Sequence, residues 1–167
     1  MLAPTGAAPS AVRSHEELFA YWAALRQGER LRGRLPGRLH IDPGDFKRHL
    51  PHISLIELRG ETRRYRMRLA GTGLYGLYGR EITGSSIEDV YPGEEARYWR
   101  DQLDAVVEGG RPAVGCRSLA WRGAPHLSVL WLRLPLASDG RKVDMILGYD
   151  ALIGLPPGGP NSGIRAA

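Results

Sequence analysis

The last third of the chain constrains the fold most, because three strand-like stretches follow one another there with only short turns between them. The stretches cover residues 113–121, 127–136 and 143–149, and the turns fall at 122–125 and 138–141. The second turn contains Asp-Gly, a strong hairpin signal. Strands joined by short turns pair antiparallel, since a parallel pair needs a long crossover. The pattern therefore predicts an antiparallel sheet.

Two further strands and two helices are predicted upstream. Strand-like stretches cover 53–58 and 64–70, and a helix with a 3–4–3 apolar stripe covers 93–108 before a double glycine. A short helix starts at the cap Asp42 and stops at Pro51. This order predicts an α+β fold, with a five-stranded antiparallel sheet, helices on one face and an N-terminal helical extension.

The N-terminal helix is predicted to begin at a capping box formed by Ser14 and Glu17, and to end at Gly28. We expect its apolar stripe to cover the outer face of the sheet or to meet a second subunit. The stripe consists of Leu18, Phe19, Trp22 and Leu25. Residues 1–13 and 151–167 are rich in small residues and proline, so disordered tails are expected on either side of a domain at 14–150.

The stretch 64–70 alternates cleanly between apolar and basic residues. Tyr65, Met67 and Leu69 fall on one face and Arg64, Arg66 and Arg68 on the other. We expect Arg66 or Arg68 to pair with an acid of the preceding segment, Asp42 or Asp45.

Composition narrows the class of protein. The chain has 167 residues, 43% hydrophobic and 25% charged, which suits one globular domain. Its net charge of +5 comes from 21 arginines against two lysines, dispersed among acids without a basic block, so no specific nucleic-acid partner is expected. No apolar run reaches the length of a membrane helix, and the N-terminus does not resemble a signal peptide. We expect a cytoplasmic protein with no membrane contact.

The order of these motifs resembles a bacterial family of stand-alone PAS-domain proteins over roughly residues 15–150. The residues that carry the resemblance are Tyr21-Trp22, Leu25-Arg26, Leu35-Pro36-Gly37-Arg38, Ile41-Asp42-Pro43, Leu50-Pro51, Leu55-Ile56, the runs 65–72 and 79–84, and Leu134-Pro135-Leu136. The resemblance implies a helical face that encloses a cleft against the sheet, and a sensory or protein-contact role. It implies no catalytic residues.

The resemblance also disfavours the familiar cofactors. Haem-binding PAS domains of the oxygen-sensing type take their axial ligand from the helices at 71–110, where this chain has no histidine. Flavin-linked photosensors carry a reactive cysteine in a helix at the cleft, whereas Cys116 lies in a strand. Neither haem nor flavin is expected, and an unknown small ligand stays open.

Four other motifs resemble functional sites but lack the surrounding residues or structure that the function needs. Residues 71–76 spell G-x-G-x-x-G, but the preceding strand alternates instead of being buried on both sides. His49 and His52 have metal-like spacing without further ligands, so surface or loop histidines and no metal are expected. Ser118, His126 and Asp144 form a nucleophile set only on paper, since no nucleophile-elbow motif is present. The single Cys116 is expected to be a buried, inert thiol.

The predicted cleft is the positive candidate for a ligand site. Mostly apolar walls with a few polar groups are typical of a small-molecule pocket, and equally of a packed core. The candidate residues are Tyr65, Met67, Tyr75, Tyr78, Trp99, Cys116, Ser118, His126, Ser128 and Leu130.

We therefore expect a non-catalytic sensory or adaptor domain that binds a small ligand, a signalling partner such as a kinase or regulator, or both. A homodimer through the N-terminal helix is a further expectation. A small enzyme acting on an apolar substrate, or an interaction module without a ligand, are the alternatives.

Overall fold

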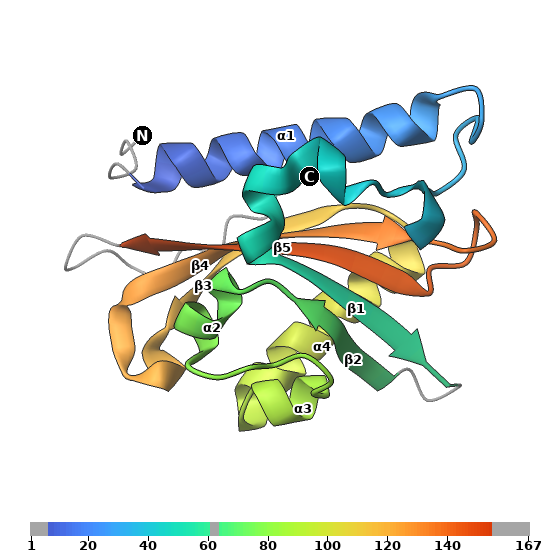
Figure 1. Ribbon diagram of the computed structural model, residues 1–167. Helices are drawn as coiled ribbons and strands as arrows, with labels where there is room; N and C mark the ends of the chain where they lie inside the picture. The colour runs from blue at the N-terminus through green and yellow to red at the C-terminus, as the bar shows by residue number, and fades with distance from the viewer. Residues whose placement is uncertain (1–6, 61–63, 155–167) are drawn as a thin grey trace.

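A computed structural model describes residues 7–60 and 64–154 (Figure 1). The helices are α1 (Ala7–Gln27), η1 (Arg38–His40), η2 (Pro43–His52), α2 (Gly73–Tyr78), α3 (Ile87–Val90), α4 (Gly93–Gly109) and η3 (Ala120–Arg122). The strands are β1 (Ile53–Arg59), β2 (Arg64–Ala70), β3 (Ala113–Leu119), β4 (Ala124–Leu136) and β5 (Met145–Gly154). They form one antiparallel sheet in the order β2-β1-β5-β4-β3. The predicted α+β fold with a five-stranded antiparallel sheet is confirmed.

Helices cover both faces of the sheet. Helix α1 lies along β4 and β5 on one side, with η2 beside it, while α2, α3 and α4 lie on the other side (Figure 1). We call the α1 side the outer face and the α2–α4 side the inner face. The outer face carries the N-terminal extension, as predicted, and the inner face carries the helices that the resemblance placed over a cleft.

Helix α1 begins at Ala7, seven residues before the predicted start. Ser14 is inside the helix, where its hydroxyl donates to the carbonyl of Ser10 at 3.1 Å, and the predicted capping box with Glu17 does not form. The added turns bury Ala11, while β5 continues to Gly154 beneath α1. Tertiary burial therefore extends both elements into segments predicted as tails; residues 1–6 and 155–167 lie outside the described residues.

The apolar stripe of α1 covers the outer face of the sheet, as predicted. Leu18 and Trp22 are buried, and the Trp22 indole N–H donates to the carbonyl of Pro135 at 2.9 Å. Leu25 packs against the core from a partly buried position. Phe19 does not belong to the buried stripe, because 47% of its surface is exposed.

A β-bulge in β2 overturns part of the predicted alternation. Leu55 pairs with Leu69 and Ile56 pairs with Met67, so Arg68 is an extra residue in β2. Tyr65 and Met67 are buried, as the alternation predicts, but Leu69 is shifted to the outer face and is 44% exposed. The bulge is invisible to a period-two pattern because it depends on the pairing with β1.

The predicted ends of several elements shift by a few residues. Asp42 caps η2 by accepting from the amide of Gly44, as predicted, but the 3₁₀ helix runs through Pro51 to His52. Strand β3 ends at Leu119 because the η3 turn follows it, and β5 starts at Met145. Along the part of the chain that is described, no helix combines the length and apolarity that crossing a bilayer requires.

Candidate functional site

A buried ion pair lies at the centre of the inner face. Arg133 on β4 and Asp150 on β5 are each 1% exposed, and an Arg133 Nη1 hydrogen donates to Asp150 Oδ1 at 2.7 Å. The same nitrogen donates to the carbonyl of Leu132 at 2.9 Å. Burial lowers the pKa of Arg133, but the charge and hydrogen bond of Asp150, together with the nearby Tyr91 and Tyr78, outweigh it and the net pKa is raised. Arg133 is therefore a permanent buried cation.

Two tyrosine hydroxyls extend this polar centre toward the helices. The Tyr78 hydroxyl donates to Asp150 Oδ2 at 3.1 Å and lies 2.8 Å from the Tyr91 hydroxyl. Burial and the nearby carboxylate raise the pKa of both phenols, so both are neutral. The chain from Tyr91 through Tyr78 and Asp150 to Arg133 connects α2 and α3 to the sheet.

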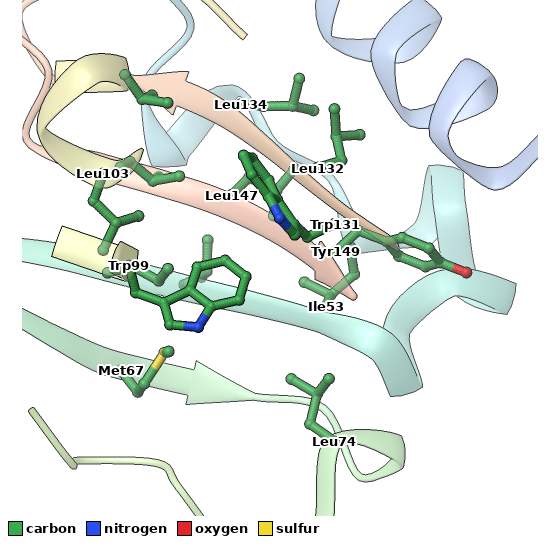
Figure 2. Packing of buried hydrophobic residues seen from close by; sticks show 14 of the residues in the cluster. Ile53, Met67, Leu74, Trp99, Leu103, Trp131, Leu132, Leu134, Leu147 and Tyr149 are labelled. Atoms are coloured by element: carbon green, nitrogen blue, oxygen red, sulfur yellow. The ribbon is translucent and has the colours of Figure 1, made fainter. Parts of the chain in front are cut away.

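Aromatic rings fill the space around the ion pair. Trp99 of α4 stacks on Tyr91 with ring centres 5.1 Å apart, and its ring centre lies 5.6 Å from that of Trp131. The guanidinium carbon of Arg133 lies 5.0 Å from the Trp99 ring centre and 5.6 Å from the Trp131 ring centre, which are cation–π distances. Figure 2 shows Trp99 and Trp131 among the buried side chains that surround them. Among Tyr78, Trp99 and Val129 no space remains that would hold a water molecule.

Two glycines allow this packing. A Cβ atom at Gly148 would lie 2.4 Å from Ser54 Oγ and 3.2 Å from Arg133 Nη1. A Cβ atom at Gly115 would lie 2.4 Å from the Trp131 ring. The side chains of Arg133 and Trp131 on β4 therefore lie over Gly148 of β5 and Gly115 of β3, where the neighbouring strand has no side chain.

The buried Ser54 hydroxyl beside Gly148 has no hydrogen-bond partner in the described residues. Three buried N–H donors also lack an acceptor there: the indole N–H groups of Trp99 and Trp131 and the Nε–H of Arg133. An unpaired buried donor costs about 1–3 kcal/mol. All three surround the same aromatic cluster. The inner face is thus closely packed, and its polar groups are only partly satisfied.

The structure divides the predicted cleft residues between the two faces of the sheet. Tyr65, Met67, Tyr78 and Trp99 are on the inner face and are buried. Cys116, Ser118, Ser128 and Leu130 share the outer face with α1, because they alternate with inner residues such as Trp131 and pair across β3 and β4. Tyr75 and His126 are exposed. These ten residues therefore do not line one pocket.

The histidines do not all lie at the surface, contrary to expectation. His15 and His49 are buried, and their rings meet Tyr149 edge-on with centres 5.5 and 5.7 Å away. His52 lies 5.9 Å from the same ring. Burial lowers the pKa of His15 to about 4, against a smaller opposing effect of the Asp150 charge. No group of three or more metal-ligating side chains occurs in residues 7–60 and 64–154.

The other motifs singled out from the sequence do not form functional sites in the structure. Gly71 and Gly73 of the G-x-G-x-x-G run pass close to the backbone of η2, since a Cβ at Gly71 would lie 2.1 Å from the carbonyl oxygen of Leu50. Asp144 lies near Leu136 at the opposite end of β4 from His126, so the Ser118–His126–Asp144 set is not assembled. Cys116 is half-buried rather than fully buried as predicted, and its partial burial raises the pKa of the thiol.

The predicted ion pairs of β2 are wrong. Arg66 and Arg68 lie near Glu57 of the neighbouring strand, at 3.8 and 3.5 Å, rather than near Asp42 or Asp45. The Arg66 guanidinium also donates to the carbonyl of Gly84 at 3.1 Å. A neighbouring strand holds the partner because cross-strand side chains are closer than those of another layer.

The outer face has an open groove on the β2–β1–β5 side. Its volume is about 520 Å³. The sheet supplies one wall, made of Ile53, Leu55, Leu69 and Leu147, and the 38–51 segment supplies the other. Arg38 and Lys47 are the only charged residues among the described residues that line it.

A second hollow, of about 530 Å³, lies between α1 and the start of β3. Phe19 and Val114 line it, and 47% and 37% of their surfaces are exposed. Glu16 borders it from α1 and Arg111 from the segment before β3, and both side chains are exposed. The outer face therefore has two open apolar hollows, whereas the inner face is closed around the aromatic cluster. Toward the end of α4, a more polar hollow of about 650 Å³ opens between Leu58, Val107 and the 138–144 turn.

Sequence reasoning missed Arg133 and Asp150, which organise the inner face. One signal was present for Arg133, which is a charged residue inside the otherwise apolar predicted strand 127–136, whereas Asp150 directly follows the predicted strand 143–149. Such a residue is almost never fully buried unless it is paired. The pairing itself depends on the register of β4 with β5, which the sequence does not display.

Comparison with known proteins identifies the family. The family model described as a PAS domain matches residues 10–151, so the chain belongs to the PAS-domain family, a class of sensory domains. A solved structure of a variant of the protein RsLOV is similar with a TM-score of 0.48 at 18% identity. The alignment covers 68% of this chain and 66% of that one, which is less than two thirds of its length. No curated protein matches the chain.

Proposed function

We propose that this PAS domain is a non-catalytic adaptor that acts as a homodimer, joined through α1 and the adjoining edge of β3. A signalling protein, such as a kinase or a regulator, would read the surface of this dimer. The observation that carries the proposal is the contrast between a closed aromatic cluster on the inner face and an exposed apolar surface around Phe19 and Val114.

The packing of the inner face supports a role without an internal cofactor. A ligand as large as flavin or haem would have to displace Trp99, Trp131 and the Arg133–Asp150 pair, and so would break a buried ion pair. The same packing speaks against a substrate pocket there. The small-enzyme alternative has support in neither the inner face nor the separated Ser118 and Asp144.

The outer surface has the chemistry that a two-fold dimer requires. Such an interface uses the same patch on both subunits, so the patch must be self-complementary. Here Glu16 and Arg111 lie on opposite rims of an apolar hollow, and no ion pair joins either to another described residue. A two-fold axis through the hollow would bring Glu16 of one subunit toward Arg111 of the other.

Measurement of the mass in solution, by light scattering or sedimentation, tests this proposal. We expect a dimer for the wild type and a monomer for Phe19→Glu, since the substitution places a charge in the apolar centre. Tyr75→Glu is the matched control, because Tyr75 is 59% exposed and lies on α2, away from α1. It should remain dimeric.

A charge exchange makes the test sharper. Glu16→Arg alone should weaken the dimer, and Glu16→Arg combined with Arg111→Glu should restore it. A wild type that stays monomeric at the highest concentration measured would refute the homodimer. A dimer that survives Phe19→Glu would place the interface elsewhere.

A further inference from the structure

The groove on the β2–β1–β5 side of the outer face combines apolar walls with positive charge. Its volume of about 520 Å³ falls within the range of small-molecule sites, about 300–1,000 Å³. No acid occurs among its described lining residues, whereas Arg38 and Lys47 both belong to the wall formed by η1 and η2. The groove is separate from the α1–β3 hollow of the proposed dimer.

The positive charges are available to a ligand. Arg38 is half-buried, and one of its Nη1 hydrogens donates to the carbonyl of Ile41 at 3.1 Å, which orients the guanidinium. In the described part of the chain neither Arg38 nor Lys47 forms an ion pair, although many other arginines do. An oriented guanidinium with its remaining donors uncommitted suits a carboxylate.

The apolar part of the groove is built by two specific backbone features. The bulge at Arg68 shifts Leu69 onto the outer face, where it stays 44% exposed beside Leu55. Gly71 then passes so close to the carbonyls of Leu50 and Pro51 that no side chain fits, which joins the two walls at one end. Bulges often occur next to functional sites, where they redirect a side chain.

We propose that this groove binds a free amphiphilic carboxylate, with a hydrocarbon chain of fatty-acid type along the sheet wall. The carboxylate is held by Arg38 and Lys47, and the tail lies against Leu55, Leu69 and Phe46. Charge complementarity selects an anionic head over a neutral or cationic one. The apolar sheet wall selects a hydrocarbon tail over a polar anion such as phosphate.

Isothermal titration with dodecanoate, below the concentration at which it forms micelles, tests the site. We expect dodecanoate to bind at least tenfold more tightly than dodecanol and than dodecyltrimethylammonium. The double variant Arg38→Gln/Lys47→Gln should lose at least tenfold of the affinity for dodecanoate and leave dodecanol unchanged. Leu69→Gln should weaken both. Arg97→Gln, an exposed arginine on α4, is the control and should bind as the wild type does.

Several outcomes would overturn the site. They are no binding of dodecanoate, equal affinity of the double variant, or a preference for the cationic amphiphile. Binding to phosphatidylglycerol vesicles that free dodecanoate does not compete away would identify a membrane surface instead. The Phe19→Glu variant should bind dodecanoate normally, so failure of this site and failure of the proposed dimer are told apart.

Discussion

The two faces of the sheet differ in whether their charged side chains form ion pairs and in how closely those side chains are packed. On the inner face, Arg133 is fully buried, paired with Asp150 and flanked by the rings of Trp99 and Trp131. On the outer face, Arg38 and Lys47 border a groove of about 520 Å³ and form no ion pair with a described acid. Both hollows proposed above as recognition surfaces lie on the outer face.

The difference between the faces predicts that stability and recognition depend on different residues. Removing either Arg133 or Asp150 should cost much stability, because the remaining charge would be left unpaired in a buried, low-dielectric environment. The outer hollows have few polar contacts to lose, so substitutions there should change binding and leave folding nearly intact. Substitutions on the two faces test this division.

Removal of Asp150 should have the largest effect. Asp150→Ala leaves Arg133 buried without its carboxylate and should lower the free energy of unfolding by about 3–5 kcal/mol. Urea unfolding followed by tryptophan fluorescence measures it. The double variant Arg133→Met/Asp150→Leu should recover at least half of that loss, because it removes both charges. A loss below about 1 kcal/mol for Asp150→Ala would mean that the inner face is hydrated.

Acid should destabilise the protein through His15. Burial lowers its pKa to about 4 in the folded state, while the unfolded value is about 6.5. Between these pH values the unfolded chain binds a proton that the folded chain does not, so stability falls as the pH falls from 6.5 to 4. The total loss is roughly 3 kcal/mol, and below pH 4 it grows no further.

His15→Phe isolates this effect, since it keeps a ring beside Tyr149 and removes the titration. The difference in unfolding free energy between the wild type and His15→Phe should shift by roughly 3 kcal/mol against the wild type between pH 7.5 and pH 4. Other titrating groups cancel in the difference. A difference that does not change with pH would show that His15 is solvated.

The sequence predicted the helices and strands better than it predicted the contacts between them. The bounds of β2 were predicted correctly because the alternation of residues 64–70 is a local pattern. Helix α4 was predicted to within a residue because its stripe and its double glycine are also local. The start of α1 was missed, since burial of Ala11 against the sheet outweighs a local capping box.

The candidate site was less predictable for the same reason. Tyr78 and Trp99 do meet on the inner face, but Cys116 and Ser128 lie on the opposite face, and assigning them needs the register of β3 with β4. Leu69 joined the outer groove through a bulge that only the pairing with β1 creates. A single sequence without strand pairing contains none of this information.

Gly71 and Gly76 provide a matched pair for the wall of the groove. A Cβ at Gly71 would meet the backbone oxygen of Leu50 at 2.1 Å, so Gly71→Ala must separate η2 from β2 and should cost about 1–3 kcal/mol. Gly76 has open space and lies inside α2, so Gly76→Ala should stabilise by up to about 1 kcal/mol. Thermal unfolding of both variants measures the contrast, and equal melting temperatures would mean that the two segments are not in contact.

The smallest effect is expected at Arg68, which is the exposed counterpart of Arg133. Its guanidinium lies 3.5 Å from Glu57, but its side chain is 57% exposed, and Arg59 and Arg66 lie near the same carboxylate. Exposed pairs contribute about 0–1 kcal/mol, and here two other cations remain after the substitution. Arg68→Ala should therefore lower the free energy of unfolding by less than about 1 kcal/mol in a urea titration. A loss comparable to that of Asp150→Ala would show that the bulge depends on this side chain, and the division between a stabilising inner face and a recognising outer face would then not hold at β2.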